Sequence, residues 1–183
     1  MNIVIDANVF VSYFKKEVLD IKKEDLTSNA VCIFDRLGKE DISYLDDGGH
    51  ILQEWRALAD PEWFETWYAD SLRDGALVLV PTENCQDLKK LIYSKYGFPK
   101  SKDFWYIKVA KRLCNDYGKS YLITEDLDFF DPKKKGCNNR IRLKLLKNSS
   151  GNLAKHLKKK ESIYIFSVIG YLEYLKKICQ LKA

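Results

Sequence analysis

The sequence predicts a three-layer α/β/α sandwich built on a central, mainly parallel sheet of about five strands. Five short apolar runs alternate with segments whose apolar residues have helical spacing, a pattern typical of βαβ units. The runs are almost wholly apolar rather than alternating, as strands buried on both faces are. With 183 residues and 46% hydrophobic content, the chain has enough apolar mass for one core, so we expect a single domain over residues 1–183.

The expected strands lie, in chain order, at residues 2–5, 42–45, 76–80, 120–123 and 163–166. Helices are expected around residues 9–14, 31–37, 50–58, 63–73, 85–96, 102–117 and 168–181. Turn-forming residues mark the boundaries at Asp47-Gly48-Gly49, Pro81, Gly97, Pro99 and Asp131-Pro132. An aromatic group with helical spacing, expected in the core or at a dimer face, comprises Trp55, Trp63, Phe64, Trp67 and Tyr68.

Charge is divided unevenly along the chain. Residues 1–132 hold 17 Lys and Arg against 24 Asp and Glu, whereas residues 133–160 hold 11 basic residues and no acidic one. This basic insertion suits a polyanion, because neutralising phosphates releases counterions. A solvated surface segment explains it equally well, and its conformation, a hairpin arm or a helix, is open. The candidate nucleic-acid contacts in it are Lys133, Lys134, Lys135, Arg140, Arg142 and Lys144.

Composition argues against several classes of protein. No stretch approaches the roughly 20 apolar residues of a membrane span, and the first residues lack the basic region of a signal peptide, so we expect a cytoplasmic protein. Five Cys without a CxxC pair favour neither a disulfide framework nor a zinc site. The chain has no glycine-rich phosphate loop, and neither of its two histidines adjoins a Ser or Cys in a recognisable nucleophile arrangement.

Four carboxylates form the candidate site. Asp6 and Asp126 each follow an expected strand, at the end where α/β sheets place their ligands. Glu54 lies on the apolar face of an expected helix, and Asp103 begins the core-facing stripe of another. Carboxylates about 5 Å apart repel by roughly 3 kcal/mol per pair at an effective dielectric of about 20. Four that converge therefore require cations or raised pKa values.

Each carboxylate also has an ordinary structural explanation. Asp6 can cap the helix that follows it, and Asp103 can interact with the dipole of its own helix. Glu54 can pair with an Arg such as Arg56, and Asp126 can lie in a solvated turn. Taken singly, each residue is weak evidence of a catalytic site, so the prediction depends on the four together.

The ordered set resembles the PIN-domain ribonuclease family over about residues 1–130. The resemblance is carried by Ile3-Val4-Ile5-Asp6-Ala7-Asn8, by the helix with Glu54, by Asp103 before Phe104-Trp105-Tyr106-Ile107-Lys108-Val109-Ala110, and by Leu122-Ile123-Thr124-Glu125-Asp126-Leu127-Asp128-Phe129. The segment from Tyr44 to Trp55, with its DxxG turn, is similar to a subgroup of PIN-like proteins.

This resemblance implies a cleft that holds Mg²⁺ or Mn²⁺ and hydrolyses a phosphodiester with metal-activated water. The catalytic residues would be Asp6, Glu54, Asp103 and Asp126. The principal metal ligands would be Asp6, Asp103 and Asp126, with Asp128 in reserve. Asn8 and Thr124 match the polar residues that usually accompany the first and fourth acids of the family.

We therefore expect a metal-dependent endoribonuclease that acts on single-stranded or structured RNA in preference to DNA, because an exposed backbone can bend into a narrow acidic site. A homodimer and an antitoxin or other protein partner are compatible with the family. Toxin, defence effector and RNA-processing enzyme are roles that the sequence does not separate. The alternative is a non-catalytic nucleic-acid- or partner-binding module that uses residues 133–160.

Two rival enzyme classes fit poorly. An aspartate-phosphorylating phosphatase pairs the Asp after its first strand with a second Asp two residues later, where this chain has Asn8. A receiver domain needs an Asp after its third strand, where this chain has Val80-Pro81-Thr82.

Overall fold

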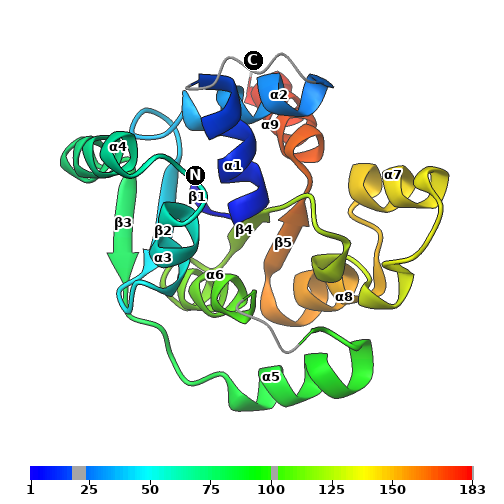
Figure 1. Ribbon diagram of the computed structural model, residues 1–183. Coiled ribbons are helices and arrows are strands. Elements are labelled where there is room, and N and C mark those ends of the chain that lie inside the picture. The colour runs from blue at the N-terminus through cyan, green and yellow to red at the C-terminus, as the bar shows by residue number, and fades with distance from the viewer. Residues whose placement is uncertain (18–23, 100–102, 183) are drawn as a thin grey trace.

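Five parallel strands form one sheet in the order β3-β2-β1-β4-β5, with helices on both faces (Figure 1). The computed structural model describes residues 1–17, 24–99 and 103–182, with the backbone alone for 24–28 and 182. The strands are β1 (Asn2–Ile5), β2 (Ile42–Asp46), β3 (Leu77–Val80), β4 (Ser120–Ile123) and β5 (Ile163–Phe166). The α/β fold class and all five expected strands are confirmed.

Helices occupy most of the remaining chain. They are α1 (Ala7–Glu17), α2 (Glu24–Phe34), α3 (His50–Arg56), α4 (Pro61–Arg73), α5 (Gln86–Leu91) with its continuation η1 (Ile92–Tyr96), α6 (Phe104–Tyr117) and α9 (Val168–Lys182). Each expected helix overlaps one of these, although Lys102, where one was expected to begin, is outside the described residues. Figure 1 shows α1, α2 and α9 on one face of the sheet and α5, α6 and α8 on the other.

The basic insertion is helical and packed against the rest of the molecule. It contains η3 (Pro132–Lys134), α7 (Asn139–Asn148), α8 (Asn152–His156) and η4 (Leu157–Glu161). The amides of Leu153 and Ala154 donate to the carbonyl oxygen of Phe130 at 3.0 and 3.1 Å. A Cβ added at Gly151 would lie 2.0 Å from that oxygen, so only glycine permits this close approach. The choice between hairpin arm and helix is thus decided in favour of helix.

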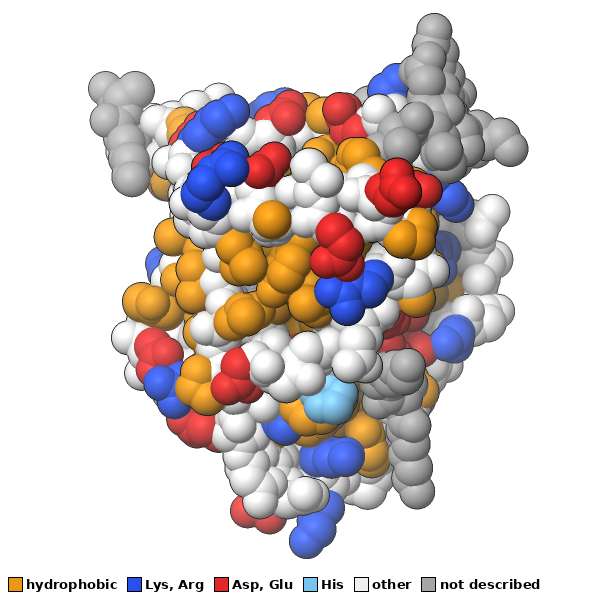
Figure 2. All heavy atoms as spheres, turned by 60° about the vertical axis from the view of Figure 1, so that its left-hand side comes forward, with side chains coloured by type: hydrophobic (Ala, Val, Ile, Leu, Met, Phe, Trp, Pro, Cys, Tyr) orange, Lys and Arg blue, Asp and Glu red, His pale blue; other side chains and the backbone are white. Residues whose placement is uncertain are grey.

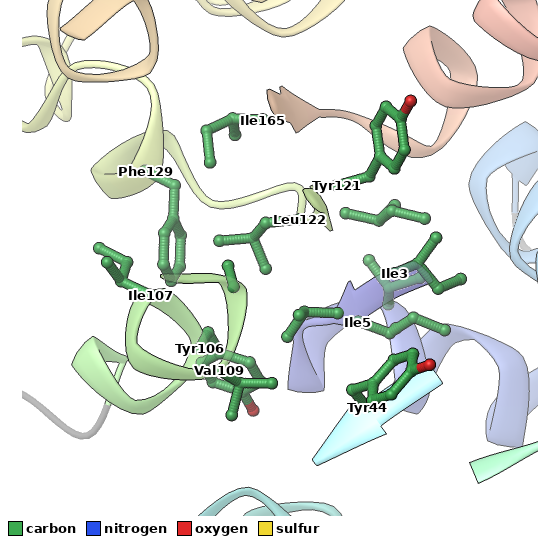
Figure 3. Close-up of a cluster of buried hydrophobic side chains, with 14 of the residues drawn as sticks. Ile3, Ile5, Tyr44, Tyr106, Ile107, Val109, Tyr121, Leu122, Phe129 and Ile165 are labelled. Carbon is green, nitrogen blue, oxygen red and sulfur yellow. The ribbon is translucent and has the colours of Figure 1, made fainter. Parts of the chain in front are cut away.

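The central strands are buried on both faces. Ile3 and Ile5 of β1, Leu122 of β4, and Ile107 and Val109 of α6 belong to one buried hydrophobic core (Figure 3). The register places Ile3 beside Tyr121 on one face of the sheet and Val4 beside Leu122 on the other. This core fixes the ends of β1 and β4, which carry the candidate site.

An aromatic cluster fills the space between α1, α3 and α4. The ring of Phe10 stacks on Trp55 with centroids 4.7 Å apart and meets the edge of Phe64 at 5.8 Å. Trp55 and Phe64 are fully buried, as expected for core residues.

On the side of the molecule that bears α4 and β3, hydrophobic side chains gather across the middle of the surface (Figure 2). Within the described ranges, no helix has both the length and the apolar character needed to cross a membrane.

The turn after β2 sets the direction of α3. The buried carboxylate of Asp46 accepts the amides of His50 at 2.9 Å and Ile51 at 2.8 Å. Gly49 precedes α3 with a φ of 74°, in the left-handed region that favours glycine. Asp46 therefore anchors the helix that carries Glu54.

We expect Asp46→Ala to lower the free energy of unfolding by about 1–2 kcal/mol, because two amides at the start of α3 lose their acceptor. The exposed neighbour Asp47 provides the control, and Asp47→Ala should change stability by less than about 0.5 kcal/mol. Urea denaturation measures both values. Equal effects of the two substitutions would contradict the anchoring role of Asp46.

Candidate active site

The loops after β1 and β4 lie side by side at the carboxyl end of the sheet. Asp6 directly follows β1, and its amide donates to the carbonyl oxygen of Ile123 at 3.0 Å. Thr124 directly follows β4, and its amide donates to Phe166 of β5 at 2.9 Å. The backbone after β1 is thus tied to β4, and the backbone after β4 is tied to β5, at the carboxyl end of the sheet.

Two polar side chains hold the Asp6 carboxylate. Both the Asn8 side-chain amide and the Thr124 hydroxyl donate to its Oδ2 atom, the latter at 2.6 Å. The Asn8 side-chain oxygen accepts the amide of Glu125 at 3.2 Å, and the Thr124 hydroxyl oxygen accepts the amide of Asp126 at 2.9 Å. The two loops are therefore tied together through the side chains that support Asp6.

Three further carboxylates act on Asp6. Its side chain is only 5% exposed, and burial is the main cause that raises its pKa. The Thr124 hydroxyl opposes this shift, while the charges of Asp103, Glu54 and Asp126 reinforce it, and the pKa reaches about 7. The other three predicted carboxylates thus lie close enough to Asp6 to raise its pKa.

The side chain of Asp103 makes no capping hydrogen bond to α6, although the residue stands at the cap position. Glu54 lies on α3, where its Oε2 atom accepts the hydroxyl of Tyr106 at 2.9 Å. The same hydroxyl accepts the amide of Ala7 at 3.2 Å. Tyr106 therefore links the start of α1 to Glu54.

Tyr106 is a site residue that the sequence interpretation missed. A usable signal was present, because Tyr106 lies three residues after Asp103 and so on the same face of its helix. Nothing in the spacing, however, indicates that its hydroxyl reaches α3.

The loop after β4 places Asp126 and Asp128 differently. Asp126 accepts the amide of Asp128 at 2.9 Å and caps the short helix η2 (Leu127–Phe129). Asp128 is buried, and its carboxylate accepts the ammonium group of Lys135 at 2.5 Å. That hydrogen bond is the main cause that raises the pKa of Lys135, and the charges of Asp126 and Asp103 add to it. Asp128, the reserve ligand, is thus engaged with Lys135, which brings a positive charge beside the carboxylates.

The other predicted basic contacts divide into two groups. Arg142 donates to the carbonyl oxygen of Glu125 at 2.8 Å, and the Glu125 carboxylate accepts the amide of Val168 at 2.8 Å, so α7 and α9 are both tied to the loop after β4. Burial raises the pKa of Glu125, and the contacts with Val168 and Arg142 oppose that rise. The remaining contacts have exposed side chains, namely Lys133, Lys134, Arg140 and Lys144.

The carboxylates do not form a closed set of direct metal ligands. Among the described residues, no three His, Cys, Asp or Glu side chains are grouped closely enough to hold a metal ion. Mg²⁺ usually retains several of its waters and needs only one or two carboxylates, which suits side chains that converge without touching. The raised pKa of Asp6 is the observation that favours a cation there, because a nearby positive charge would stabilise the ionised form.

Comparisons with protein-family models, curated proteins and solved structures find no match to this chain. The functional conclusion below therefore depends on the geometry of the site and on the resemblance carried by its residues.

Without a divalent cation, we expect the protein to lose stability as the pH rises from about 4 to about 7. In that range the folded protein keeps a proton on Asp6, whereas the unfolded chain, with a pKa near 3.8, has released it. The shift to about 7 corresponds to a loss on the order of 4 kcal/mol. Thermal melts in EDTA from acidic to alkaline pH measure this loss.

Added Mg²⁺ should restore stability at the alkaline end, and Asp6→Asn should remove most of the pH dependence. An equally steep dependence in Asp6→Asn would show that another group titrates.

We expect Tyr106→Phe to lower the free energy of unfolding by about 1–2 kcal/mol, because the amide of Ala7 and the carboxylate of Glu54 both lose a hydrogen bond. Tyr117→Phe, on the same helix but half exposed, is the control. It removes one hydrogen bond, accepted from the Tyr44 hydroxyl at 3.3 Å, and should cost about 0.5 kcal/mol. Urea denaturation compares the two. If they are equally stable, the Tyr106 hydroxyl does not organise the site.

Proposed function

We propose that this protein is a Mg²⁺- or Mn²⁺-dependent endoribonuclease of the PIN-like type, which hydrolyses phosphodiester bonds in single-stranded or structured RNA. The observation that carries the proposal is the buried carboxylate of Asp6, whose pKa is raised by burial and by the charges of Asp103, Glu54 and Asp126. Burying one carboxylate beside three others that are only partly exposed is costly in a purely structural role. Their position at the carboxyl ends of parallel strands is where α/β folds bind ligands.

In this proposal, Asp6, Asp103 and Asp126 hold the ion, directly or through water. A bound ion supplies an activated water as nucleophile and stabilises the charge on the phosphate. Asn8 and Thr124 keep the Asp6 carboxylate oriented through their hydrogen bonds to its Oδ2 atom.

The remaining site residues would assist this arrangement. Tyr106 holds Glu54 in place for its supporting role. Lys135, already paired with Asp128, reduces the repulsion that an incoming phosphate meets at the acidic cluster.

Two features support a single strand of nucleic acid as substrate, and the preference for RNA remains part of the proposal. The exposed basic residues of the insertion lie on the segment that follows Asp126 and Asp128, so they can attract a phosphate backbone towards the cluster. Close to Glu54 and Asp103 in the sequence, the exposed ring of His50 stacks on Trp105 at 3.7 Å, which offers aromatic surface to an unpaired base. A strand with unpaired bases would contact the basic residues through its phosphates and the His50–Trp105 stack through a base.

We also propose a cellular location and protein partners. All five cysteines are unpaired, which is compatible with a reducing cytoplasm. Leu58, Leu72 and Leu79, which are exposed on or beside α4 and the edge strand β3, support a homodimer through that side of the molecule. An antitoxin or other inhibitory protein is a further proposed partner.

We expect Asp6→Asn and Asp103→Asn to reduce metal-dependent cleavage by on the order of 100-fold or more, since even residues that only support metal ligands typically contribute 10–100-fold. The exposed Asp87 on α5 is the control, and Asp87→Asn should cleave like the unmodified protein. The measurement is cleavage of end-labelled single-stranded RNA and DNA in EDTA, Mg²⁺ or Mn²⁺.

Metal-dependent cleavage that persists in purified Asp6→Asn would reject the assignment. Salt-sensitive RNA binding without cleavage, independent of metal and of Asp6, would instead favour the non-catalytic binding module built on residues 133–160.

A further inference from the structure

A second feature lies outside the acidic cluster, at the edge of the sheet. A cavity of about 440 Å³ opens beside β5, between the end of α7, η4 and α9. In Figure 1, α7 stands beside β5, with α8 below it and α9 above. We call this cavity the β5 groove. Its volume lies within the range typical of ligand pockets, about 300–1,000 Å³.

The β5 groove is basic. Three lysines from three separate elements line it: Lys147 of α7, Lys158 of η4 and Lys177 of α9. Among the described residues that line the groove, Glu173 is the only acidic one. The groove therefore favours an anionic ligand.

Aromatic rings accompany the lysines. Tyr164, Phe166 and Tyr174 line the groove and are partly exposed. The rings of Phe166 and Tyr174 stack with centroids 5.1 Å apart, and the ammonium group of Lys158 lies 5.3 Å from the centroid of Tyr164. Proteins that bind single-stranded nucleic acids combine lysines with exposed aromatic rings in this way. The phosphates pair with the cations and the bases stack on the rings.

The β5 groove is connected to the acidic cluster by a backbone hydrogen bond and by helix α7. The carbonyl oxygen of Phe166 accepts the amide of Thr124, whose hydroxyl holds Asp6. Helix α7 connects the two regions, because Arg142 binds the loop after β4 while Lys147 lines the groove. Adjacent strands lie about 4.8 Å apart, so β5 is about two strand spacings from β1, and a ligand in the groove lies beside β5.

We propose that the β5 groove binds nucleotides of a single-stranded nucleic acid, with bases stacked on the aromatic rings and phosphates paired with the three lysines. The identity of the strand rests on the proposed function: it is the RNA, held on one side of the bond that is cleaved at the acidic cluster. The aromatic rings favour this ligand over an acidic peptide paired with the edge of β5.

The test is binding of a labelled single-stranded 2′-O-methyl RNA of about 12 nucleotides, a length within known single-strand site sizes, measured by fluorescence anisotropy in EDTA. The groove variant combines Lys158→Gln and Lys177→Gln. The control variant combines Lys159→Gln and Lys176→Gln, which remove the same charge from the exposed neighbouring positions outside the groove. Matching melting temperatures establish that both variants are folded.

We expect the groove variant to bind about 3- to 10-fold more weakly and the control variant to bind like the unmodified protein. Loss of two phosphate contacts should also reduce the slope of log affinity against log salt by about 1.4, at roughly 0.7 per contact on a single strand. An abasic strand of the same length should bind more weakly to the unmodified protein, because stacking is lost.

Equal weakening in both variants would overturn the proposal, since it would reveal only general electrostatic attraction. Unchanged RNA binding by the groove variant would also overturn the proposal. So would displacement of the labelled RNA by a glutamate-rich peptide that does not bind the groove variant. Because the assay contains no metal, its result is independent of cleavage. If the groove variant binds RNA normally, Asp6-dependent cleavage can still be observed. If no cleavage is observed, the binding assay still tests the groove.

Discussion

The hydrogen bond from Thr124 to the buried carboxylate of Asp6 is the contact on which the rest of the site depends. It joins the loops that follow two neighbouring strands, and the same hydroxyl oxygen receives the amide of Asp126. The surrounding core excludes water from Asp6, so its ionised form is disfavoured even with this bond in place. Without a nearby positive charge, such a group keeps its proton until the pH approaches 7, and the metal ion proposed for this site would supply that charge.

The remaining parts of the molecule position charges around that carboxylate. Helix α3, anchored by Asp46, presents Glu54, and α6 contributes the hydroxyl of Tyr106 that holds it. The basic insertion belongs to the same unit, because Lys135 reaches Asp128 while Arg142 binds the loop after β4. The insertion is thus a structural part of the site as well as a basic surface. The β5 groove, which the insertion lines with Lys147 and Lys158, continues the basic surface away from the acidic cluster.

Much of this arrangement could be predicted from the sequence because the signals were local. Short apolar runs located all five strands, and parallel strands bring their carboxyl ends to one edge, which placed Asp6 and Asp126 at the same edge of the sheet. The contact of Thr124 with Asp6 could not be predicted, because it depends on β1 and β4 being neighbours. The partner of Tyr106 could not be predicted, because it depends on where α3 lies relative to α6. The pairing of Lys135 with Asp128 depends on the geometry of the 3₁₀ turns η2 and η3. The conformation of the insertion stayed open because Ile141, Leu143 and Leu145 of α7 alternate with basic residues, a spacing that also suits a strand.

The most direct test of the account is the number of protons released when Mn²⁺ binds, measured by titration calorimetry near pH 6 in buffers of different ionisation enthalpy. Asp6, with a pKa of about 7, is mostly protonated there and must ionise to bind the metal. The account predicts release of about one proton by the unmodified protein and almost none by Asp6→Asn. Mn²⁺ binding without proton release, or equal release by both proteins, would contradict the claim that the buried carboxylate of Asp6 is the centre of a metal site.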